Sequence, residues 1–570
     1  MIREDIRKIV RNAAEKKFGN IGEPVFTVEV PENSEHGDYS TNIAMALART
    51  IKKNPLEIAA LLTESLKAEK LFSSVAAAPP GFINFRLNEV NLLSEIQKKL
   101  KNKKAFGKTN VGKGKTVLVE YFQLNIAKRP HVGHLRSAVI GDALKRVLLL
   151  SGYKAVSDTH VGDWGTQFGI LLLGFKEAGM SVKDKKVLAD PFGVLEELYI
   201  KENEKIEADS DRREKAKLEF AKLEKGDREN RKIWKWMVDI SMKNLETSAH
   251  HLGLLKFDEH KGESSYEKDM PGIVALAFTK RVAIKKDGAA IVDLSDEKLD
   301  EAVLVKSDGA STYLLRDLAT IQYREKKKYF KNLYVVDVRQ QHHFRQVHFV
   351  AASLGFNFEG ESRLVEFGAM TLPEGKMSTR KGNIISLESL LKEAGERALK
   401  VIKEKNPELK NMGSVAGAVG LGAIKYFDLS RNRKSDIVFR WEDALAFEGN
   451  TGPYLQYTHA RLKSILRKAK KTVKLPKNIP VLSDLEHEIL SRILSFEEAI
   501  EDSLASYAPN ILANYLHSLA QNVNEFYHSH PVLNEPDEGK KAVRLMLVES
   551  STTALKQGLW CLGIVAPEEM

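Results

Sequence analysis

Residues 116–156 are the most informative stretch of this 570-residue chain and read TVLVEYFQLNIAKRPHVGHLRSAVIGDALKRVLLLSGYKAV. Thr116 to Phe122 is rich in β-branched and aromatic residues, which favour a strand. From about His134 to Leu150, apolar residues recur at helical spacing, and Gly152 ends the pattern. Tyr153 to Val156 then begins another strand. A strand, a helix and a strand in succession predict a βαβ unit, which requires a parallel sheet.

The segment NIAKRPHVGH, residues 125–134, lies between the first strand and the helix. This is the carboxyl edge of a parallel sheet, where doubly wound folds bind nucleotides and where helix N–H groups favour a phosphate. His131 and His134 can donate hydrogen bonds to phosphoryl oxygens, and Gly133 lets a purine approach the backbone. The pattern alone also fits two surface histidines. It fits zinc poorly, because no Glu follows the first His and the single cysteine is Cys561.

A second basic segment, KMSTRKGN at residues 376–383, follows the turn at residues 373–375. Lys376, Arg380 and Lys381 on such a loop can close over a polyphosphate, since lysine is a mobile point charge. Taken alone, the segment is more typical of a solvated basic loop.

The rest of the chain indicates several domains, as its length predicts. The first hundred residues alternate helices and short strands, and residues 101–115 are a Lys- and Gly-rich tether. Residues 176–260 are helical and very highly charged, which favours an insertion lying over the sheet.

Strand patterns resume at Ala302 to Lys306, Leu333 to Val338 and Leu364 to Phe367. After about residue 440 they stop, and Ser483 to Glu486 is a capping box that opens a helix. The sequence therefore predicts a multidomain α/β protein with a Rossmann-like parallel sheet, a helical insertion, a small α+β N-terminal domain and an all-α C-terminal bundle.

Charge and composition limit the function classes. The formal net charge of +11 favours a polyanionic partner, although a chance excess of lysine on a soluble surface is an alternative. One cysteine excludes an internal disulfide. The charged N-terminus and the lack of a long apolar run predict a cytoplasmic protein that spans no membrane.

Together, the two basic segments resemble the paired signatures HIGH and KMSKS of class I aminoacyl-tRNA synthetases. The resemblance narrows to arginyl-tRNA synthetase through motifs that cover nearly the whole chain. These are residues 125–142, HVGDWGTQFG at 160–169, DGASTY at 308–313, RD at 316–317, QQHHFRQ at 340–346, HGDYS at 36–40 and LGIVAPE at 562–568.

The resemblance implies a monomeric ligase that joins arginine to tRNA(Arg) with ATP and substrate-bound Mg²⁺, and no metal site of its own. It assigns ATP binding to His131, Gly133, His134, Lys376, Met377, Ser378, Arg380 and Lys381. It places Lys128 beside the first histidine as a further catalytic cation, because Thr379 stands where the signature has lysine. It assigns arginine binding to Glu120, Asn125, Tyr313, Asp317 and Gln340.

Physical chemistry agrees with that assignment, because a planar guanidinium prefers carboxylates that bind it in a bidentate manner. Tyr313 and Asp317 are four residues apart at a predicted helix start and so share one face. One departure stands out: Gln123 and Leu124 occupy positions where the family usually has Ser and Pro. Any pocket contact that the Ser would make is therefore in question.

The resemblance implies domains at residues 1–108, which contact the tRNA elbow, at 109–390 with an insertion at about 176–300, at 391–445 as a helical connector, and at 446–570, which read the anticodon. Aromatic residues available to stack on anticodon bases are Tyr454, Tyr457, Phe526, Tyr527 and Trp560. Two alternatives stay open: another class I synthetase or adenylyltransferase, and a catalytically silent tRNA-binding paralogue.

Overall fold

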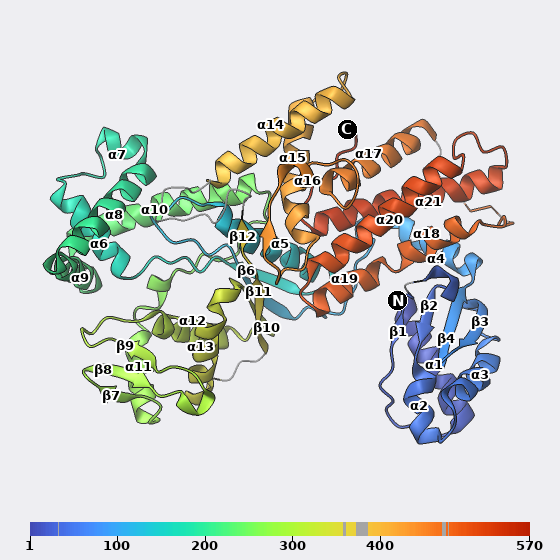
Figure 1. Cartoon of the computed structure of the whole chain (residues 1–570), viewed down its shortest axis with the longest axis horizontal. Coiled ribbons are helices and arrows are strands. Elements are labelled where there is room, and N and C mark those ends of the chain that lie inside the picture. The colour runs from blue at the N-terminus through green and yellow to red at the C-terminus, as the bar shows by residue number, and fades with distance from the viewer. Residues whose placement is uncertain (32, 357–360, 372–385, 470–474, 477) are drawn as a thin grey trace.

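The computed structural model describes residues 1–31, 33–356, 361–371, 386–469, 475–476 and 478–570, and it has an N-terminal domain, a central α/β domain with insertions, and a C-terminal helical part (Figure 1). None of the described helices is long and apolar enough to cross a membrane.

The N-terminal domain is an antiparallel sheet covered by helices, as predicted. Its strand order is β1-β2-β4-β3. Helix α1 buries Ile6, Val10 and Ala14 on one stripe, and Asn54 caps α3 by accepting the Leu56 N–H. The elements are α1 (Ile2–Phe18), β1 (Val28–Glu29), β2 (Tyr39–Thr41), α2 (Ile43–Ile51), α3 (Pro55–Leu66), β3 (Phe72–Ala78), β4 (Phe82–Leu87) and α4 (Glu89–Lys101).

The central sheet is parallel and has the order β11-β10-β5-β6, which confirms the Rossmann-like prediction. Its strands are β5 (Thr116–Glu120), β6 (Lys154–Asp158), β10 (Lys331–Asp337) and β11 (Glu361–Phe367). Helix α5 (Leu135–Leu150) is buried on nearly every side. The chain leaves β5 towards β6 on one side and reaches β10 on the other, so a switch point lies between β5 and β10.

One strand prediction is wrong. Ala302 to Lys306 does not join the central sheet. Instead, β9 (Ala302–Val305) pairs antiparallel with β8 (Ala289–Val292), which pairs with β7 (Ile284–Lys286). An alternating pattern identifies a strand but not its neighbour. These strands, α11 (Met270–Thr279), α12 (Tyr313–Lys327) and α13 (Gln341–Ser353) form the lower left lobe of Figure 1.

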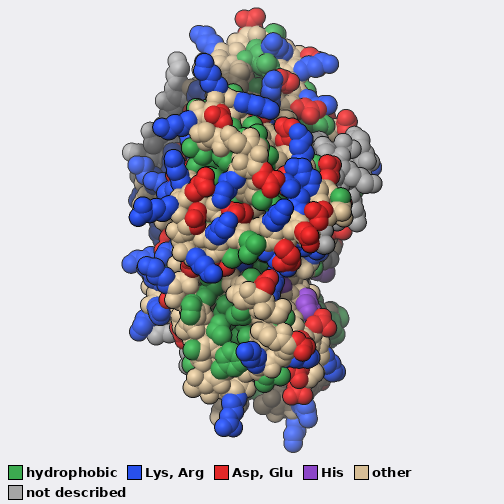
Figure 2. Space-filling model, turned by 90° about the vertical axis from the view of Figure 1, so that its left-hand side faces the viewer, with side chains coloured by type: hydrophobic (Ala, Val, Ile, Leu, Met, Phe, Trp, Pro, Cys, Tyr) green, Lys and Arg blue, Asp and Glu red, His purple; other side chains and the backbone are tan. Residues whose placement is uncertain are grey.

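The charged insertion is helical, as predicted, but it extends away from the sheet and does not lie over it (Figure 1). It comprises α6 (Thr166–Glu177), α7 (Lys185–Ala189), α8 (Pro191–Ala208), α9 (Ser210–Glu224) and α10 (Arg228–His251), which returns to the centre. Figure 2 shows this face with both charge signs interspersed in its upper part. Pairs such as Lys176 with Glu219 and Arg212 with Glu202 explain the balance.

In the described residues from 370 on, the C-terminal part is helical apart from one short strand pair, β12 (Met370–Thr371) with β13 (Ile437–Val438). The Ser483 capping box is present. The helices are α14 (Leu387–Lys405), α15 (Met412–Leu429), α16 (Trp441–Ala444), α17 (Gly452–Ala469), α18 (Asp484–Leu494), α19 (Phe496–Ala505), α20 (Pro509–Ser529) and α21 (Glu538–Cys561).

Residues 101–115 are not the free tether that their composition predicted. Phe106 is buried, and its ring centroid lies 6.0 Å from that of Phe496 on α19. A Cβ on Gly107 would lie 2.4 Å from the same ring, so only glycine fits there. The segment is therefore packed against the C-terminal bundle.

The N-terminal domain is held to the bundle by a buried charged histidine. His487 on α18 lies 2.9 Å from Asp38 through Nε2 and 3.2 Å from Glu89 through Nδ1. Burial disfavours the charged ring, but the hydrogen bond and the charge of Asp38 outweigh it and raise the pKa of His487. Because both nitrogens face carboxylates, each carries a proton.

The His487 interaction predicts pH-dependent stability. A raised pKa in the folded state stabilises below the unfolded value of about 6.5, and this contribution is lost as the pH rises through the folded value. We expect His487→Gln to reduce stability by about 2 kcal/mol at pH 6 and by less at high pH, as measured by thermal unfolding. His251→Gln, on the exposed end of α10, is the control. Equal losses at both pH values would contradict this role.

Candidate active site

Two histidines at the start of α5 are locked in one tautomer by the backbone. In the turn Val132–His134, His131 Nδ1 accepts the Gly133 N–H at 3.1 Å, and His134 Nδ1 accepts the His131 N–H at 3.2 Å. A backbone N–H can only donate, so each neutral ring carries its proton on Nε2. The ring centroids are 4.0 Å apart. The turn thus holds two Nε2–H donors side by side at the carboxyl edge of the sheet.

Both imidazoles are neutral at physiological pH. Burial lowers the pKa of His134 to about 3, and burial and the charge of Lys128 lower the pKa of His131. Burial also lowers the pKa of Lys128, whose Nζ lies 5.2 Å from the centre of the Tyr199 ring. The site therefore combines neutral hydrogen-bond donors with one nearby lysine.

Gly133 is needed for a different reason from the one that the sequence indicated. A Cβ at this position would lie 2.8 Å from Cε1 and 2.9 Å from Nδ1 of His131. The glycine therefore makes room for the His131 ring that caps its own N–H. Access for a purine stays a prediction.

The second basic segment lies outside the described residues. It contains five of the residues predicted to bind ATP: Lys376, Met377, Ser378, Arg380 and Lys381. Both flanks of that segment are attached to the histidine region. On one flank, Ser386 forms a β-bridge with His131, and the Leu387 N–H donates to the Pro130 carbonyl at 3.1 Å. Ser386 and Leu387 therefore lie beside His131.

On the other flank, Arg136 of α5 makes the connection. Its Nη1 donates to the carbonyls of Gly368 at 2.7 Å and Ser435 at 2.9 Å, and its Nε donates to Asp428 at 3.0 Å. Gly368 and Ser435 each lie two residues before a strand of the pair β12–β13. Described residues on both sides of residues 372–385, Gly368 before them and Ser386 after them, are thus bonded to the chain around the start of α5.

Carboxylates gather at the ends of β5 and β6 and at the start of α12. Glu120 and Asp158 are buried, and both pair with the buried Arg324, at 2.5 and 3.1 Å. Asp317 accepts from His343 at 2.6 Å and lies 3.6 Å from His160. We call Glu120, Asp158 and Asp317 the acidic cluster.

Asp317 keeps its charge through its histidine partners. Burial would protonate Asp317, but hydrogen bonds from His160 and His343 outweigh it and lower its pKa. Burial likewise opposes the charge on His160, but Glu120 and Asp317 raise its pKa to about 9. His160 is therefore a cation at neutral pH. A cluster of carboxylates with such partners is typical of a site for a positively charged ligand.

The other predicted arginine-binding residues lie at the surface near these strand ends. Asn125 follows β5 and forms a β-bridge with Gly162, and Gln340 follows β10; both side chains are exposed. Tyr313 begins α12 one turn before Asp317 and is exposed, with the Arg316 guanidinium 4.9 Å from its ring centre.

Sequence reasoning did not assign roles to His160, Arg324 or Arg136. His160 and Arg136 lie inside motifs that the resemblance quoted, so a signal existed for them. Arg324 lies outside those motifs, and its two carboxylate partners are far away in the sequence. Only the fold brings Arg324 to Glu120 and Asp158.

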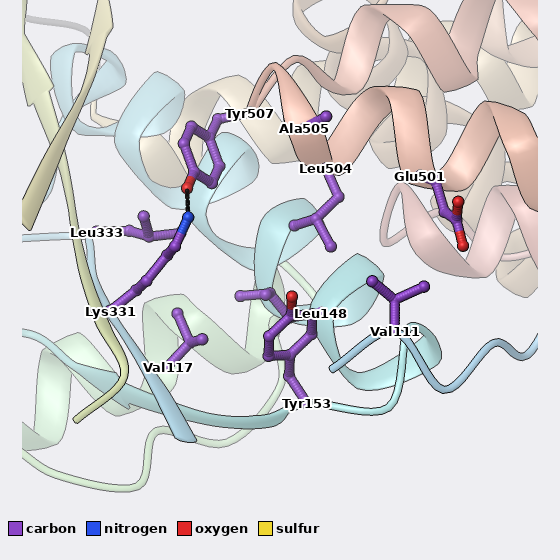
Figure 3. A pocket seen from close by; sticks show the side chains of 10 residues that line it. All are labelled: Val111, Val117, Leu148, Tyr153, Lys331, Leu333, Glu501, Leu504, Ala505 and Tyr507. Carbon is purple, nitrogen blue, oxygen red and sulfur yellow. Dashed lines mark hydrogen bonds between the residues drawn. The ribbon is translucent and has the colours of Figure 1, made fainter. Parts of the chain in front are cut away.

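A cavity of about 270 Å³ lies at the opposite, amino edge of the sheet, where the C-terminal bundle meets it (Figure 3). Val117 and Leu333 line it from the sheet, and Leu504 lines it from α19. Lys331 Nζ donates to the Tyr507 hydroxyl at 3.1 Å across it. This cavity belongs to the domain joint and is separate from the histidine turn.

The fold and the site define a class I aminoacyl-tRNA synthetase. The family models for the catalytic domain of class I (R) tRNA synthetases, the DALR anticodon binding domain and the arginyl tRNA synthetase N-terminal domain match residues 95–441, 455–570 and 2–87. The chain belongs to the arginyl-tRNA synthetase family. The limits expected at residues 108, 390 and 445 stay predictions.

Arginine–tRNA ligases are similar over almost the whole chain. That of Clostridium botulinum is 37% identical over 95% of this chain and 96% of its own, and that of Lactococcus lactis is 38% identical over 95% of each. The solved Thermus thermophilus arginyl-tRNA synthetase covers both chains completely, with a TM-score of 0.83 and 27% identity. The Plasmodium falciparum structure has a TM-score of 0.82 and 25% identity.

The geometry of the turn predicts the effect of one methyl group. Gly133→Ala should push the His131 ring out of its cap, because the new Cβ would overlap that ring. We expect ATP-dependent arginine charging to fall about a hundredfold, mainly in kcat, with unchanged thermal stability. Gly413→Ala, at the start of α15 with nothing within 4 Å, is the matched control. Normal activity of Gly133→Ala would show that the cap is dispensable.

Proposed function

We propose that this chain joins arginine to tRNA(Arg) in two steps, with the histidine turn and the acidic cluster as the two halves of one active site. The observation that carries the proposal is their common position. Two neutral Nε2–H donors and a set of partnered carboxylates occupy the carboxyl edge of one parallel sheet. Such an edge is where open α/β sheets bind ligands.

In the first step, the arginine carboxylate attacks the α-phosphorus of ATP and displaces pyrophosphate. Nε2–H groups of His131 and His134 stabilise the charge that grows on the α-phosphoryl oxygens. Lys376 and the residues up to Lys381 neutralise the β- and γ-phosphates, and Lys128 adds a cation. The attachment of both flanks of the Lys376 segment to the start of α5 supports this arrangement.

Mg²⁺ is expected to arrive with the phosphates of ATP. Across the part of the chain that the structure describes, no three His, Cys, Asp or Glu side chains are grouped as a metal site. We therefore assign the protein's own contribution to positioning and to hydrogen bonds from its side chains.

Arginine is recognised through its guanidinium by Glu120 and Asp317, while Asn125, Tyr313 and Gln340 orient the rest of the molecule. The buried His160 Nδ1 and the hydroxyls of Tyr266 and Tyr334 have no hydrogen-bond partner among the described residues. Such groups are normally satisfied by a ligand or water, which supports a polar ligand at the cluster. A neutral isostere such as citrulline would leave the carboxylates unpaired and is rejected.

In the second step, the 2′-hydroxyl of the terminal ribose of the tRNA attacks the arginyl adenylate and releases AMP. We propose that the N-terminal domain contacts the tRNA elbow and that the bundle reads the anticodon. Phe526 is buried, and Trp560 stacks with Arg146 at 5.3 Å. Tyr457 and the exposed Tyr527 flank Arg461, at 4.7 and 5.0 Å. We propose that anticodon bases stack on the aromatic rings of Tyr457 and Tyr527.

The direct test is charging of tRNA by the purified chain with each amino acid. We expect arginine to be charged, and ATP–pyrophosphate exchange with arginine to require tRNA, as the family does. Preferential charging of glutamate or glutamine would favour a different class I synthetase. Binding of tRNA without any charging would favour a silent paralogue. Robust exchange without tRNA would overturn the tRNA requirement alone.

The role of the histidine turn has its own test. His134→Ala removes one Nε2–H donor, and we expect charging to fall on the order of a hundredfold while tRNA binding stays nearly unchanged. His251→Ala on the exposed end of α10 should leave both unchanged. Equal losses of charging and tRNA binding by His134→Ala would point to misfolding in place of a catalytic role.

A further inference from the structure

Gln123, where this chain departs from its family, lies at the switch point between β5 and β10. Its half-buried side-chain amide makes three hydrogen bonds. Nε2 donates to Glu120 Oε1 at 3.2 Å and to the Val335 carbonyl of β10 at 3.3 Å, and Oε1 accepts from the Ser137 hydroxyl at 3.0 Å. Both N–H groups of the amide are therefore used, and its oxygen shares the single Ser137 hydroxyl proton with the Val335 carbonyl, which lies 3.1 Å from Ser137 Oγ.

Ser137 connects this network to the histidine turn. It lies on α5, one turn after His134. Its Oγ also accepts the Phe122 N–H at 2.9 Å, which holds Phe122 in a left-handed conformation with φ of 59°. The amide of Gln123 thus links a carboxylate of the acidic cluster to the helix that carries both histidines.

Glu120 has a different partner at each of its two oxygens, an ion pair at Oε2 and a hydrogen bond at Oε1. Arg324 is 2.5 Å from Oε2 and is fully charged, whereas Gln123 is a neutral donor to Oε1. A neutral donor fixes the direction of a carboxylate without cancelling its charge. Oε1, which can accept further hydrogen bonds, is therefore held in place for a second guanidinium.

The backbone of the loop does not depend on the proline that the family usually has. The Leu124 carbonyl accepts the Gly162 N–H at 2.9 Å, and the Gly162 carbonyl accepts the Ile126 N–H at 3.2 Å. Leu124 itself is buried. These bonds to the chain after β6 fix the loop, so the position of Gln123 is set by the fold.

We propose that Gln123 is a positioning residue for arginine. Its amide links the Glu120 carboxylate to the Ser137 hydroxyl and so sets the geometry in which the substrate guanidinium is bound. The inference rests on the proposed function, in which Glu120 contacts that guanidinium. In this chain, the longer side chain of a glutamine occupies the position of the family's serine. A serine side chain is two atoms shorter in reach and would not join Glu120 to Ser137.

Arginine affinity tests the proposal, measured by isothermal titration calorimetry on the full chain. Gln123→Met keeps the length of the side chain but removes every hydrogen bond, and we expect it to weaken arginine binding about tenfold with ATP binding within twofold. Gln123→Ser should bind arginine as weakly as Gln123→Met. Gln123→Glu should be weaker still, because an acceptor would face Glu120. The control is Gln322→Ala, which changes a half-buried glutamine on α12 and should leave arginine affinity normal.

A second measurement separates positioning from general packing. In a Glu120→Gln background, Gln123→Met should cause no further loss of arginine affinity, because the carboxylate that it positions is gone. The same tenfold loss in both backgrounds would overturn the proposal. So would wild-type affinity of Gln123→Ser or Gln123→Met, or an equal loss of arginine and ATP binding with a lowered thermal midpoint.

The outcomes also separate this inference from the function on which it rests. If the wild-type chain charges tRNA with arginine and the Gln123 variants bind arginine normally, only the role of Gln123 fails. If the wild-type chain binds no arginine, the proposed function fails first, and the role of Gln123 fails with it.

Discussion

The buried ion pair between Arg136 and Asp428 is the interaction on which the rest of the active site depends. Each side chain is 1% exposed. Breaking such a pair from one side leaves an uncompensated charge and costs about 3–5 kcal/mol. The same guanidinium holds the carbonyls of Gly368 and Ser435. One side chain therefore connects the histidine helix, the residues that lead into the strand pair β12–β13, and α15.

The second constraint is charge balance at the carboxyl edge. Burial disfavours the charges of Glu120, Asp158 and Asp317, and the fold places the cations Arg324 and His160 beside them, while His343 hydrogen-bonds to Asp317. In the function that we propose, this cluster binds a guanidinium, and such a site cannot neutralise all of its carboxylates completely. A protonated imidazole at 3.6 Å from Asp317 stabilises that carboxylate in the absence of substrate and leaves oxygen lone pairs open to a stronger, bidentate partner.

Periodicity alone predicted β5 and α5, because a fully buried strand and a helix buried all round leave strong apolar patterns. It could not predict the sheet to which Ala302–Val305 belongs, since alternation carries no information about the neighbour. Nor could it reveal the pairing of Glu120 with Arg324, which is long-range. The left-handed conformations of Phe122 and His160 have no sequence signal, because bulky residues rarely adopt them. The roles of the residues from Lys376 to Lys381 stay predictions.

Helix α15 also joins the active site to the bundle that we propose reads the anticodon. Asp428 anchors Arg136 at one end of the helix, and Lys425 Nζ, one turn earlier, donates to the Gly563 carbonyl at 2.6 Å. Further along the C-terminal segment, Gln456 donates to Val565 at 2.7 Å and also to Ala418 of α15. Buried polar contacts of this kind permit few alternative arrangements. A shift of the bundle must therefore either move α15 or break these bonds, and moving α15 displaces the carboxylate that holds the histidine helix.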